Sequence, residues 1–223
     1  MKPGIRIYFA DTEPLKNEAV YGKLYNSLPE ERKKKADRFR FEKDRFLSVG
    51  AGALLLKALS DAGIDDAEFA EGEKQKPFIK NHPEIFFNLS HSEEKIMCVV
   101  SDREVGCDIE KIKENTNDIA GRYFAGEEKN AIDSAERKDE MFFRIWTLKE
   151  SYIKAIGLGL SLSLKDFSII TGDEISAVCG GIKTGYSFFE FRDIGGYCCS
   201  CCVKGDQKDL PMKIEFIDLS GGN

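Results

Sequence analysis

Two stretches carry the strongest signals in this chain: Gly106-Cys107-Asp108-Ile109-Glu110 and Trp146-Thr147-Leu148-Lys149-Glu150-Ser151-Tyr152-Ile153-Lys154. Asp108 and Glu110 are two residues apart, so on a strand both side chains point to one face. Glu150 and Lys154 are four residues apart, so on a helix they are neighbours. A fold that brings this strand to this helix would assemble three carboxylates and a lysine, a set suited to holding a magnesium pyrophosphate.

Each part of this set also has a simpler interpretation. The acids would be surface residues at a strand end, and Glu150 with Lys154 a helical ion pair worth about a few tenths of a kcal/mol. An Asp-x-Glu pair alone is weak, because the chain holds 39 acidic residues. The preceding glycine and the aromatic-rich helix raise the signal. Trp146, the only tryptophan, should be a core or half-buried aromatic that fixes the position of Glu150.

The composition is that of a globular protein with one or two domains: 223 residues, 42% hydrophobic and 32% charged. A net charge of −6 argues against general binding to a nucleic-acid backbone, although a local basic pocket for one anion remains compatible with it. No apolar stretch is long enough to span a bilayer, and residues 1–6 lack a signal-peptide core. We therefore expect a cytoplasmic protein with no nucleic-acid or membrane partner, and with seven free thiols.

Four of the cysteines lie in Cys198-Cys199-Ser200-Cys201-Cys202, which allows two interpretations. One is a metal–thiolate site, and the other is a strand after the turn at Gly195-Gly196. Adjacent strand residues point to opposite faces, the spacing matches no usual zinc pattern, and His82 and His91 are the only histidines. These observations favour the strand.

The patterning predicts an α+β chain. Helices are expected over residues 11–28, 44–62, 118–124, 127–135 and 139–156, and Ser27-Leu28-Pro29-Glu30 resembles a capping box that opens the basic segment 32–35. Strands are expected over residues 4–10, 68–70, 77–79, 85–89, 95–101, 104–110, 167–171, 174–178, 186–192, 197–203 and 212–217. Helices precede strands twice, so we expect two similar halves, residues 1–102 and 103–223, each with a small antiparallel sheet packed on helices.

The segment Asn88-Leu89-Ser90-His91-Ser92 follows an apolar run and offers hydroxyls and an imidazole at a strand end. Ser90 and His91 are adjacent, and strand neighbours point apart, which disfavours a nucleophile–base pair. Contact with a phosphate is the favoured interpretation, and an exposed histidine of no consequence is the alternative.

Basic residues elsewhere in the chain could serve the same anion. Lys76 lies just upstream of the serine-rich segment, and Arg45 lies at the start of the second long helix. The run from Arg32 to Lys35 is most simply a solvated helix face.

Taken in order, these motifs resemble the 4′-phosphopantetheinyl transferases, specifically the long, surfactin-synthetase-activating type. That family carries Lys-Pro, Asn-x-Ser-His-Ser, Gly-x-Asp-x-Glu, Trp-x-x-Lys-Glu-Ser-x-x-Lys and Gly-x-Gly-Leu. In this chain the corresponding stretches are Lys76-Pro77, 88–92, 106–110, 146–154 and Gly157-Leu158-Gly159-Leu160. The resemblance runs from roughly residue 40 to 170, and the motifs together are very specific.

The resemblance implies a pseudo-dimeric α+β fold with coenzyme A bound between the halves. The implied reaction transfers the 4′-phosphopantetheine arm of coenzyme A to a serine of a carrier protein and releases adenosine 3′,5′-bisphosphate. Asp108, Glu110 and Glu150 would hold Mg²⁺, with Mn²⁺ as an alternative. Glu150 would also be the base for the carrier serine, directly or through water, and Lys154 would contact the pyrophosphate.

The same resemblance implies contacts with the rest of coenzyme A. Ser90 and His91 would hold its phosphates, with His91 on the 3′-phosphate, and Lys76 would lie along the nucleotide. Where the family has an arginine in the second helix, this chain offers Arg45 near the helix start and Ser48 further in. An acid that follows a phenylalanine in the family matches Glu128, with Glu127 competing for the position. By analogy the chain should be a monomer.

Three rival functions use the same residues differently. A metal-dependent phosphohydrolase would share the metal site and need no carrier protein. A non-catalytic nucleotide-binding or carrier-binding module would keep the fold without turnover, although it need not retain Asp108, Glu110, Glu150 and Lys154 together. A plain structural domain would not explain why the motifs occur together.

Overall fold

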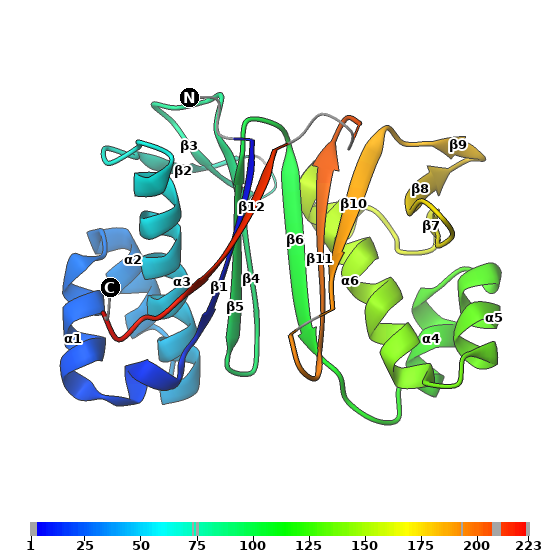
Figure 1. Ribbon diagram of the computed structural model, residues 1–223, viewed down its shortest axis with the longest axis horizontal. Helices are drawn as coiled ribbons and strands as arrows, with labels where there is room; N and C mark the ends of the chain where they lie inside the picture. The colour runs from blue at the N-terminus through cyan, green and yellow to red at the C-terminus, as the bar shows by residue number, and fades with distance from the viewer. Residues whose placement is uncertain (1–3, 73, 75, 193, 207–210, 222–223) are drawn as a thin grey trace.

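The structure is a computed structural model that describes residues 4–72, 74, 76–192, 194–206 and 211–221. Helices lie at the two ends of the molecule, and the strands of two large sheets lie between them (Figure 1). The first half forms β1 (Ile5–Asp11), the 3-10 helix η1 (Glu13–Lys16), α1 (Glu18–Ser27), α2 (Glu30–Asp37), α3 (Glu42–Asp61), β2 (Phe69–Glu71), β3 (Pro77–Ile79), β4 (Phe86–Ser92) and β5 (Lys95–Ser101). The second half forms β6 (Val105–Lys111), α4 (Asn117–Tyr123), α5 (Gly126–Ser134), α6 (Lys138–Ile156), η2 (Gly159–Ser161), β7 (Phe167–Ile170), β8 (Ser176–Cys179), β9 (Ile182–Lys183), β10 (Tyr186–Phe191), β11 (Tyr197–Lys204) and β12 (Met212–Ile217).

The first large sheet has the strand order β12-β1-β5-β4. Strands β1, β5 and β4 are antiparallel neighbours, whereas β12 pairs with β1 in parallel. Alternation along β1 sends Tyr8 and Ala10 toward a core that contains the buried residues of α3, and sends Ile5, Ile7 and Phe9 to the opposite face. The long helix α3 therefore covers one face of this sheet.

The second large sheet has the strand order β10-β11-β6 and is antiparallel throughout. Helix α6 packs on one face of it, because apolar residues at helical spacing, including Leu148, Tyr152 and Ala155, share a core with Cys202 of β11. Two smaller sheets, β2-β3 and β7-β8-β9, lie beside the two large ones.

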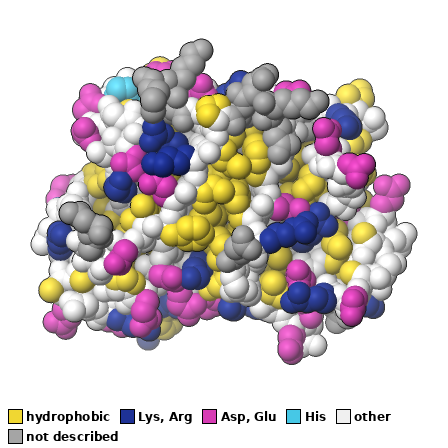
Figure 2. Space-filling view, in the orientation of Figure 1, with side chains coloured by type: hydrophobic (Ala, Val, Ile, Leu, Met, Phe, Trp, Pro, Cys, Tyr) yellow, Lys and Arg dark blue, Asp and Glu magenta, His cyan; other side chains and the backbone are white. Residues whose placement is uncertain are grey.

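The inner faces of the two large sheets share a third core. Ile5, Ile7 and Phe9 of β1 pack there with Cys107 and Ile109 of β6, and residues of β5 and β11 complete the cluster. Hydrophobic side chains are visible over the middle of the molecule in Figure 2. Phe216 of β12 is 69% exposed. The layers are thus helices, sheet, sheet and helix.

The α+β class with two halves, each having a sheet packed on helices, is confirmed. The strand predicted over residues 197–203 is also confirmed, as β11. The division at residues 102 and 103 stays a prediction. β12 comes after that division in the sequence, yet it pairs with β1. A strand of the second half of the chain therefore extends the sheet of the first half.

Two local predictions are wrong. The helix expected over residues 11–28 is split into η1 and α1, because the Asn17 side chain accepts hydrogen bonds from the Ala19 and Val20 amides and starts a new helix. The capping box at Ser27 is absent, because the Ser27 hydroxyl donates to the Leu24 carbonyl and Pro29 occupies the N-cap of α2. The two-residue strand β9 was not predicted.

Within the described residues, no helix combines the length and the apolar character that a membrane crossing requires.

Candidate active site

Gly106 determines how closely α6 approaches β6. A Cβ atom at this position would lie 2.1 Å from the Ser151 carbonyl oxygen and 2.3 Å from the Ala155 nitrogen, so only glycine fits. Asp108 and Glu110 follow Gly106 at alternate positions of β6 and share its face. The close contact therefore brings these acids under the helix that carries Glu150 and Lys154.

Lys154 and Asp108 form the centre of the site. The Lys154 ammonium lies 2.6 Å from Asp108 Oδ1 and also donates to the Ser90 hydroxyl at 3.1 Å, and Ser90 donates to the same Oδ1 at 2.7 Å. Burial acts to lower the pKa of Lys154, but the Asp108 carboxylate outweighs it, so the pKa is raised overall. The lysine is therefore a charged partner of Asp108.

Glu110 and Glu150 are half-buried acids, and the charge of Asp108 acts to raise the pKa of both. Desolvation, followed by repulsion from Asp108, raises the pKa of Glu110, although the Ser92 hydroxyl donates to it at 2.7 Å. Desolvation also raises the pKa of Glu150, while the charge of Lys154 acts to lower it and that of Asp108 to raise it. All four charged residues predicted from the two motifs thus interact at the contact of β6 with α6.

A divalent cation suits this group of oxygens. Asp108 is 2% exposed, and its Oδ2 is buried with no hydrogen-bond partner among the described residues. This unpartnered, buried carboxylate oxygen lies beside two acids of raised pKa, so a cation would stabilise the group. Carboxylates are also the protein ligands that Mg²⁺ prefers. Among the described residues, no three metal-ligating side chains lie close enough together to hold a metal ion. The assignment therefore rests on the chemistry of Asp108, Glu110 and Glu150.

The segment 88–92 joins the two halves of the molecule. Asn88 Oδ1 accepts from the Cys107 amide at 2.9 Å, the Ser90 hydroxyl from the Ile109 amide at 3.4 Å, and the Ser92 hydroxyl from the Lys111 amide at 3.1 Å. Alternate side chains of β4 thereby satisfy alternate amides of β6 across the gap between the two sheets. The predicted phosphate contact of Ser90 stays a prediction, and its hydroxyl already has three protein partners.

His91 lies on the other side of β4, at a hollow of about 260 Å³ lined also by Arg32, Lys35 and Ser48. The ring is at the surface, yet the surrounding walls partly desolvate it, and this effect with the Lys154 charge lowers its pKa. Arg32 is half-buried, so the solvated-face interpretation is wrong for this residue. Asp44 also lines the hollow, but the cations Arg32 and Lys35 together with the His91 ring suit a phosphorylated ligand.

Two other basic residues do not line this hollow. Arg45 is half-buried near Tyr21: burial raises the pKa of Tyr21, and the charge of Arg45 opposes this rise. The Lys76 ammonium donates to the Ala155 carbonyl at 2.7 Å and to the Val105 carbonyl at 3.4 Å, so it ties the loop before β3 to the end of α6. The nucleotide contacts expected of both residues stay predictions.

A second hollow, of about 470 Å³, lies on the α6 side of the site. Glu150 and Lys154 line it together with the apolar side chains of Tyr123, Trp146 and Ile153. Trp146 is half-buried, as predicted, and its ring stacks on Phe142 with centroids 5.8 Å apart. The two hollows meet at Asn88, which lines both.

Sequence reasoning missed the role of Lys149. Its ammonium is fully buried, lies 2.8 Å from Glu128 Oε1, and donates to the carbonyls of Leu164 and Phe167 at 2.6 Å each. Glu128 also accepts from the Ile169 and Ala125 amides, whereas Glu127 is exposed. The pair fixes α6 against α5 and β7. The sequence signal for this role was Lys149 itself, a charged residue within the aromatic-rich stretch of α6.

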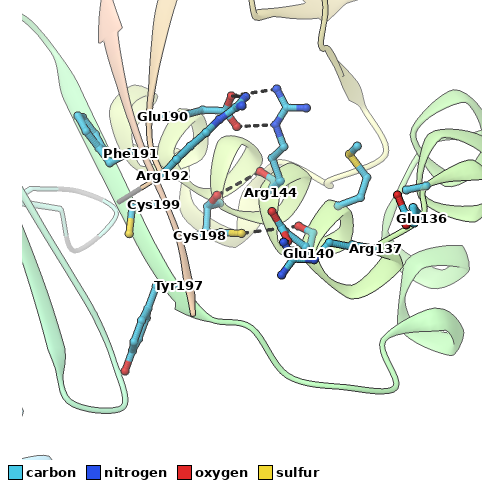
Figure 3. A pocket seen from close by; sticks show the side chains of 13 residues that line it. Glu136, Arg137, Glu140, Arg144, Glu190, Phe191, Arg192, Tyr197, Cys198 and Cys199 are labelled. Carbon is cyan, nitrogen blue, oxygen red and sulfur yellow. Dashed lines mark hydrogen bonds and ion pairs between the residues drawn. The ribbon is translucent and has the colours of Figure 1, made fainter. Parts of the chain in front are cut away.

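A third hollow, of about 430 Å³, lies beside the first turns of α6. In Figure 3, Arg144 of α6 points toward Glu190 of β10, and the two form paired hydrogen bonds of 2.6 and 2.9 Å. The Cys198 thiol contacts the Glu140 carbonyl at 3.6 Å. The basic residues of this third hollow are paired with its acids, so it does not offer free positive charge to a phosphate.

Comparison with known proteins gives consistent results. The family model of the 4′-phosphopantetheinyl transferase superfamily matches residues 104–202. A 4′-phosphopantetheinyl transferase of Bacillus subtilis is 34% identical over 157 residues, which are 68% of this chain and 70% of that protein. The 4′-phosphopantetheinyl transferase gsp of Aneurinibacillus migulanus is 32% identical over 189 residues, which are 82% of this chain and 79% of that protein. The solved Thermotoga maritima holo-[acyl-carrier-protein] synthase is 19% identical, with a TM-score of 0.40, over 48% of this chain and 66% of that one.

Proposed function

This chain belongs to the 4′-phosphopantetheinyl transferase superfamily, and we propose that it acts as a holo-[carrier protein] synthase. In this function it transfers the 4′-phosphopantetheine group of coenzyme A to a serine of an acyl or peptidyl carrier protein and releases adenosine 3′,5′-bisphosphate. The observation that carries the proposal is the contact of β6 with α6. There Lys154 pairs with Asp108 Oδ1, while Asp108 Oδ2 has no partner in the part of the chain that the structure describes.

The substrate would lie along the seam between the halves. Arg32, Lys35 and His91 line the first hollow and would bind the phosphorylated nucleotide. The second hollow has mostly apolar walls and would take the pantetheine arm. Lys76 lines the second hollow, and Ser90 donates to Asp108. With Arg45 they would make the phosphate and nucleotide contacts that the family resemblance implies.

Asp108, Glu110 and Glu150 would hold Mg²⁺, with Mn²⁺ as an alternative, at the pyrophosphate. When bound, the metal supplies positive charge to the phosphoryl oxygens. The donor set supports this choice, because hard oxygen ligands with open positions for phosphate and water suit Mg²⁺.

The reaction is a displacement at phosphorus. The serine oxygen forms a bond to the phosphorus that carries the pantetheine arm, and the bond from that phosphorus to the bridging oxygen breaks. The serine proton passes to the Glu150 carboxylate, directly or through water, because a hydroxyl is a weak nucleophile without a base. Negative charge grows on the bridging oxygen, and the Lys154 ammonium, 2.6 Å from Asp108, supplies positive charge in this region.

Intact-mass spectrometry of an apo carrier protein tests the proposal. The carrier is incubated with this chain, coenzyme A and Mg²⁺, with EDTA in a parallel sample. A gain of one phosphopantetheine group that EDTA abolishes is the expected result. An acyl carrier and a peptidyl carrier are both included, because either presents a suitable serine. No mass gain on any carrier, with no binding of coenzyme A, would overturn the assignment.

The same experiment separates the rival functions. Release of phosphate from simple esters without any change in carrier mass would favour a phosphohydrolase. Binding of coenzyme A without transfer to any carrier would favour a non-catalytic module. Because both halves of one chain contribute to the site, one copy should suffice for activity, as expected of a monomer, and sedimentation under assay conditions tests this. The cytoplasmic location stays a prediction.

A further inference from the structure

We propose that Ser200 is a positioning residue whose hydroxyl donates to Asp108 Oδ2 and fixes the orientation of that carboxylate toward a bound divalent cation. The proposal rests on the proposed function, because it concerns the same metal site. It gives a role to the one hydroxyl in the run Cys198-Cys199-Ser200-Cys201-Cys202, which the transferase assignment left unexplained.

Both atoms of the proposed hydrogen bond are buried and unpartnered. Ser200 is 0% exposed and Asp108 is 2% exposed. The Ser200 hydroxyl and Asp108 Oδ2 have no hydrogen-bond partner within the described part of the chain. Buried polar atoms are almost always hydrogen-bonded in proteins, so two such exceptions beside each other need an explanation.

The strand register makes these two residues direct neighbours. Ser200 of β11 faces Asp108 of β6 in the antiparallel pair. Facing residues in such a pair have Cβ atoms about 4.5–5.5 Å apart, and both side chains point to the same side of the sheet. Ser200 has one side-chain torsion with three staggered positions, so its hydroxyl can change direction without any movement of the backbone.

The thiols on either side of Ser200 are engaged elsewhere. Cys199 and Cys201 point to the core between the two sheets. Cys202 packs in the core under α6, and the Cys198 thiol contacts the Glu140 carbonyl. Only the hydroxyl of this run therefore faces the unsatisfied oxygen of the candidate active site.

The alternatives for each atom are also occupied. Glu190 of β10 faces Ser200 from the other side, but its two oxygens accept from Arg144 at 2.6 and 2.9 Å, as Figure 3 shows. Asp108 Oδ1 already accepts from Lys154 and Ser90. Of these side-chain atoms, the Ser200 hydroxyl and Asp108 Oδ2 are the two that have no hydrogen bond among the described residues.

A carboxylate oxygen has two lone pairs, so Oδ2 can accept from Ser200 and still bind a cation. Hydrogen bonds to ligating carboxylates hold them in the productive orientation, and loss of such a partner lowers metal affinity by about 10–100-fold. On this basis Ser200 would set the metal affinity of the site without touching substrate.

Mn²⁺ binding, followed by electron paramagnetic resonance without coenzyme A, is the direct test. In Ser200→Ala the dissociation constant for Mn²⁺ should rise about 10-fold or more. Ser200→Cys has a weaker donor of similar size and should fall between the wild type and Ser200→Ala. Transfer assays should show a higher metal concentration at half-maximal rate in the same order. The KM for coenzyme A at saturating metal should change little, which a general loss of structure would not produce.

Ser187→Ala is the matched control, because this hydroxyl lies in the same sheet and donates to the Gly205 carbonyl, away from Asp108. It should bind Mn²⁺ as the wild type does. If Ser200→Ala is folded and binds Mn²⁺ within twofold of the wild type, the inference is wrong and the proposed function survives. If the wild type itself binds no Mn²⁺, the metal site fails and the inference fails with it.

Discussion

Lys149 and Lys154 lie on the same helix, and each pairs with a carboxylate brought by another element. At Lys149 the pair is fully buried, and the ammonium has three acceptors: Glu128 and the carbonyls of Leu164 and Phe167. At Lys154 the side chain is 28% exposed, and its partner Asp108 has one buried oxygen with no hydrogen bond to any described residue. The first pair is closed and the second is open.

This difference separates a structural ion pair from a functional one. A buried charge is tolerated when its partner and hydrogen bonds compensate for lost hydration, as they do around Glu128 and Lys149. In the open pair, Asp108 Oδ2 keeps a lone pair for a cation next to Glu110 and Glu150, even with the proposed hydrogen bond from Ser200. The two pairs should therefore respond differently to substitution: one in stability, the other in catalysis.

The largest effect is expected at the open pair. Glu150→Gln removes the base for the carrier serine and one carboxylate of the metal set, so transfer should fall by about 10²–10⁴-fold. Asp108→Ala should also nearly abolish transfer. Both variants should keep cooperative unfolding, because neither residue belongs to a closed pair. The rate of holo-carrier formation, measured by intact mass, gives the result.

Glu127→Gln is the control for this substitution, since Glu127 is an exposed acid of the same half. It should transfer at the wild-type rate. A folded Glu150→Gln variant with a near-normal rate would refute the assignment of the open pair to catalysis.

The closed pair should show the reverse behaviour. Lys149→Met leaves Glu128 buried without its cation and should lower the free energy of unfolding by about 3–5 kcal/mol. Adding Glu128→Gln removes the unpaired charge and should restore part of this loss. Urea unfolding measures stability, and transfer per folded molecule should change far less than in Glu150→Gln. Unchanged stability in Lys149→Met would mean that the closed pair does not hold α6 in place.

Metal should stabilise the protein only through the open pair. A cation at 100 times its dissociation constant should add about 2.7 kcal/mol to the free energy of unfolding. EDTA should remove this increment, and Asp108→Asn should abolish it while the Lys149→Met variant retains it. Thermal unfolding with and without Mg²⁺ measures the effect. An equal metal response in Asp108→Asn would place the cation elsewhere.

The seam between the halves should contribute a smaller amount. Asn88→Ala leaves the buried Cys107 amide without its acceptor and should cost about 1–3 kcal/mol in unfolding free energy. Asn88→Asp retains an acceptor oxygen at this position and is the control. If the alanine variant is as stable as the wild type, side-chain bonding between β4 and β6 is not what joins the sheets.

The sequence predicted the group of residues that contains the open pair, but neither the contact of Lys154 with Asp108 nor the closed pair. Spacing alone placed Asp108 with Glu110 and Glu150 with Lys154, because strand and helix periods are local properties. Whether Lys149 was buried depended on α5 and β7, which approach it only in the folded chain. For the same reason Ser90 was read as a ligand contact, although its hydroxyl also bridges β4 and β6. The helix over residues 11–28 failed because one local side-chain cap at Asn17 outweighed the apolar periodicity.

An exposed pair gives the smallest effect and shows what burial adds. His82 Nε2 lies 2.8 Å from Asp66 Oδ1, and this contact raises the pKa of His82 and lowers that of Asp66. The stabilisation should be present below the unfolded pKa of His82 and should disappear as pH rises through its raised folded value; it should also weaken as pH falls through the Asp66 pKa. The urea midpoint of His82→Gln should therefore differ slightly from the wild type near about pH 5.5 and match it above about pH 8. Added salt should reduce the difference, because exposed charges are screened. A difference that is constant across pH would mean that His82 acts through packing, and the contrast with the two pairs of α6 would then not depend on charge.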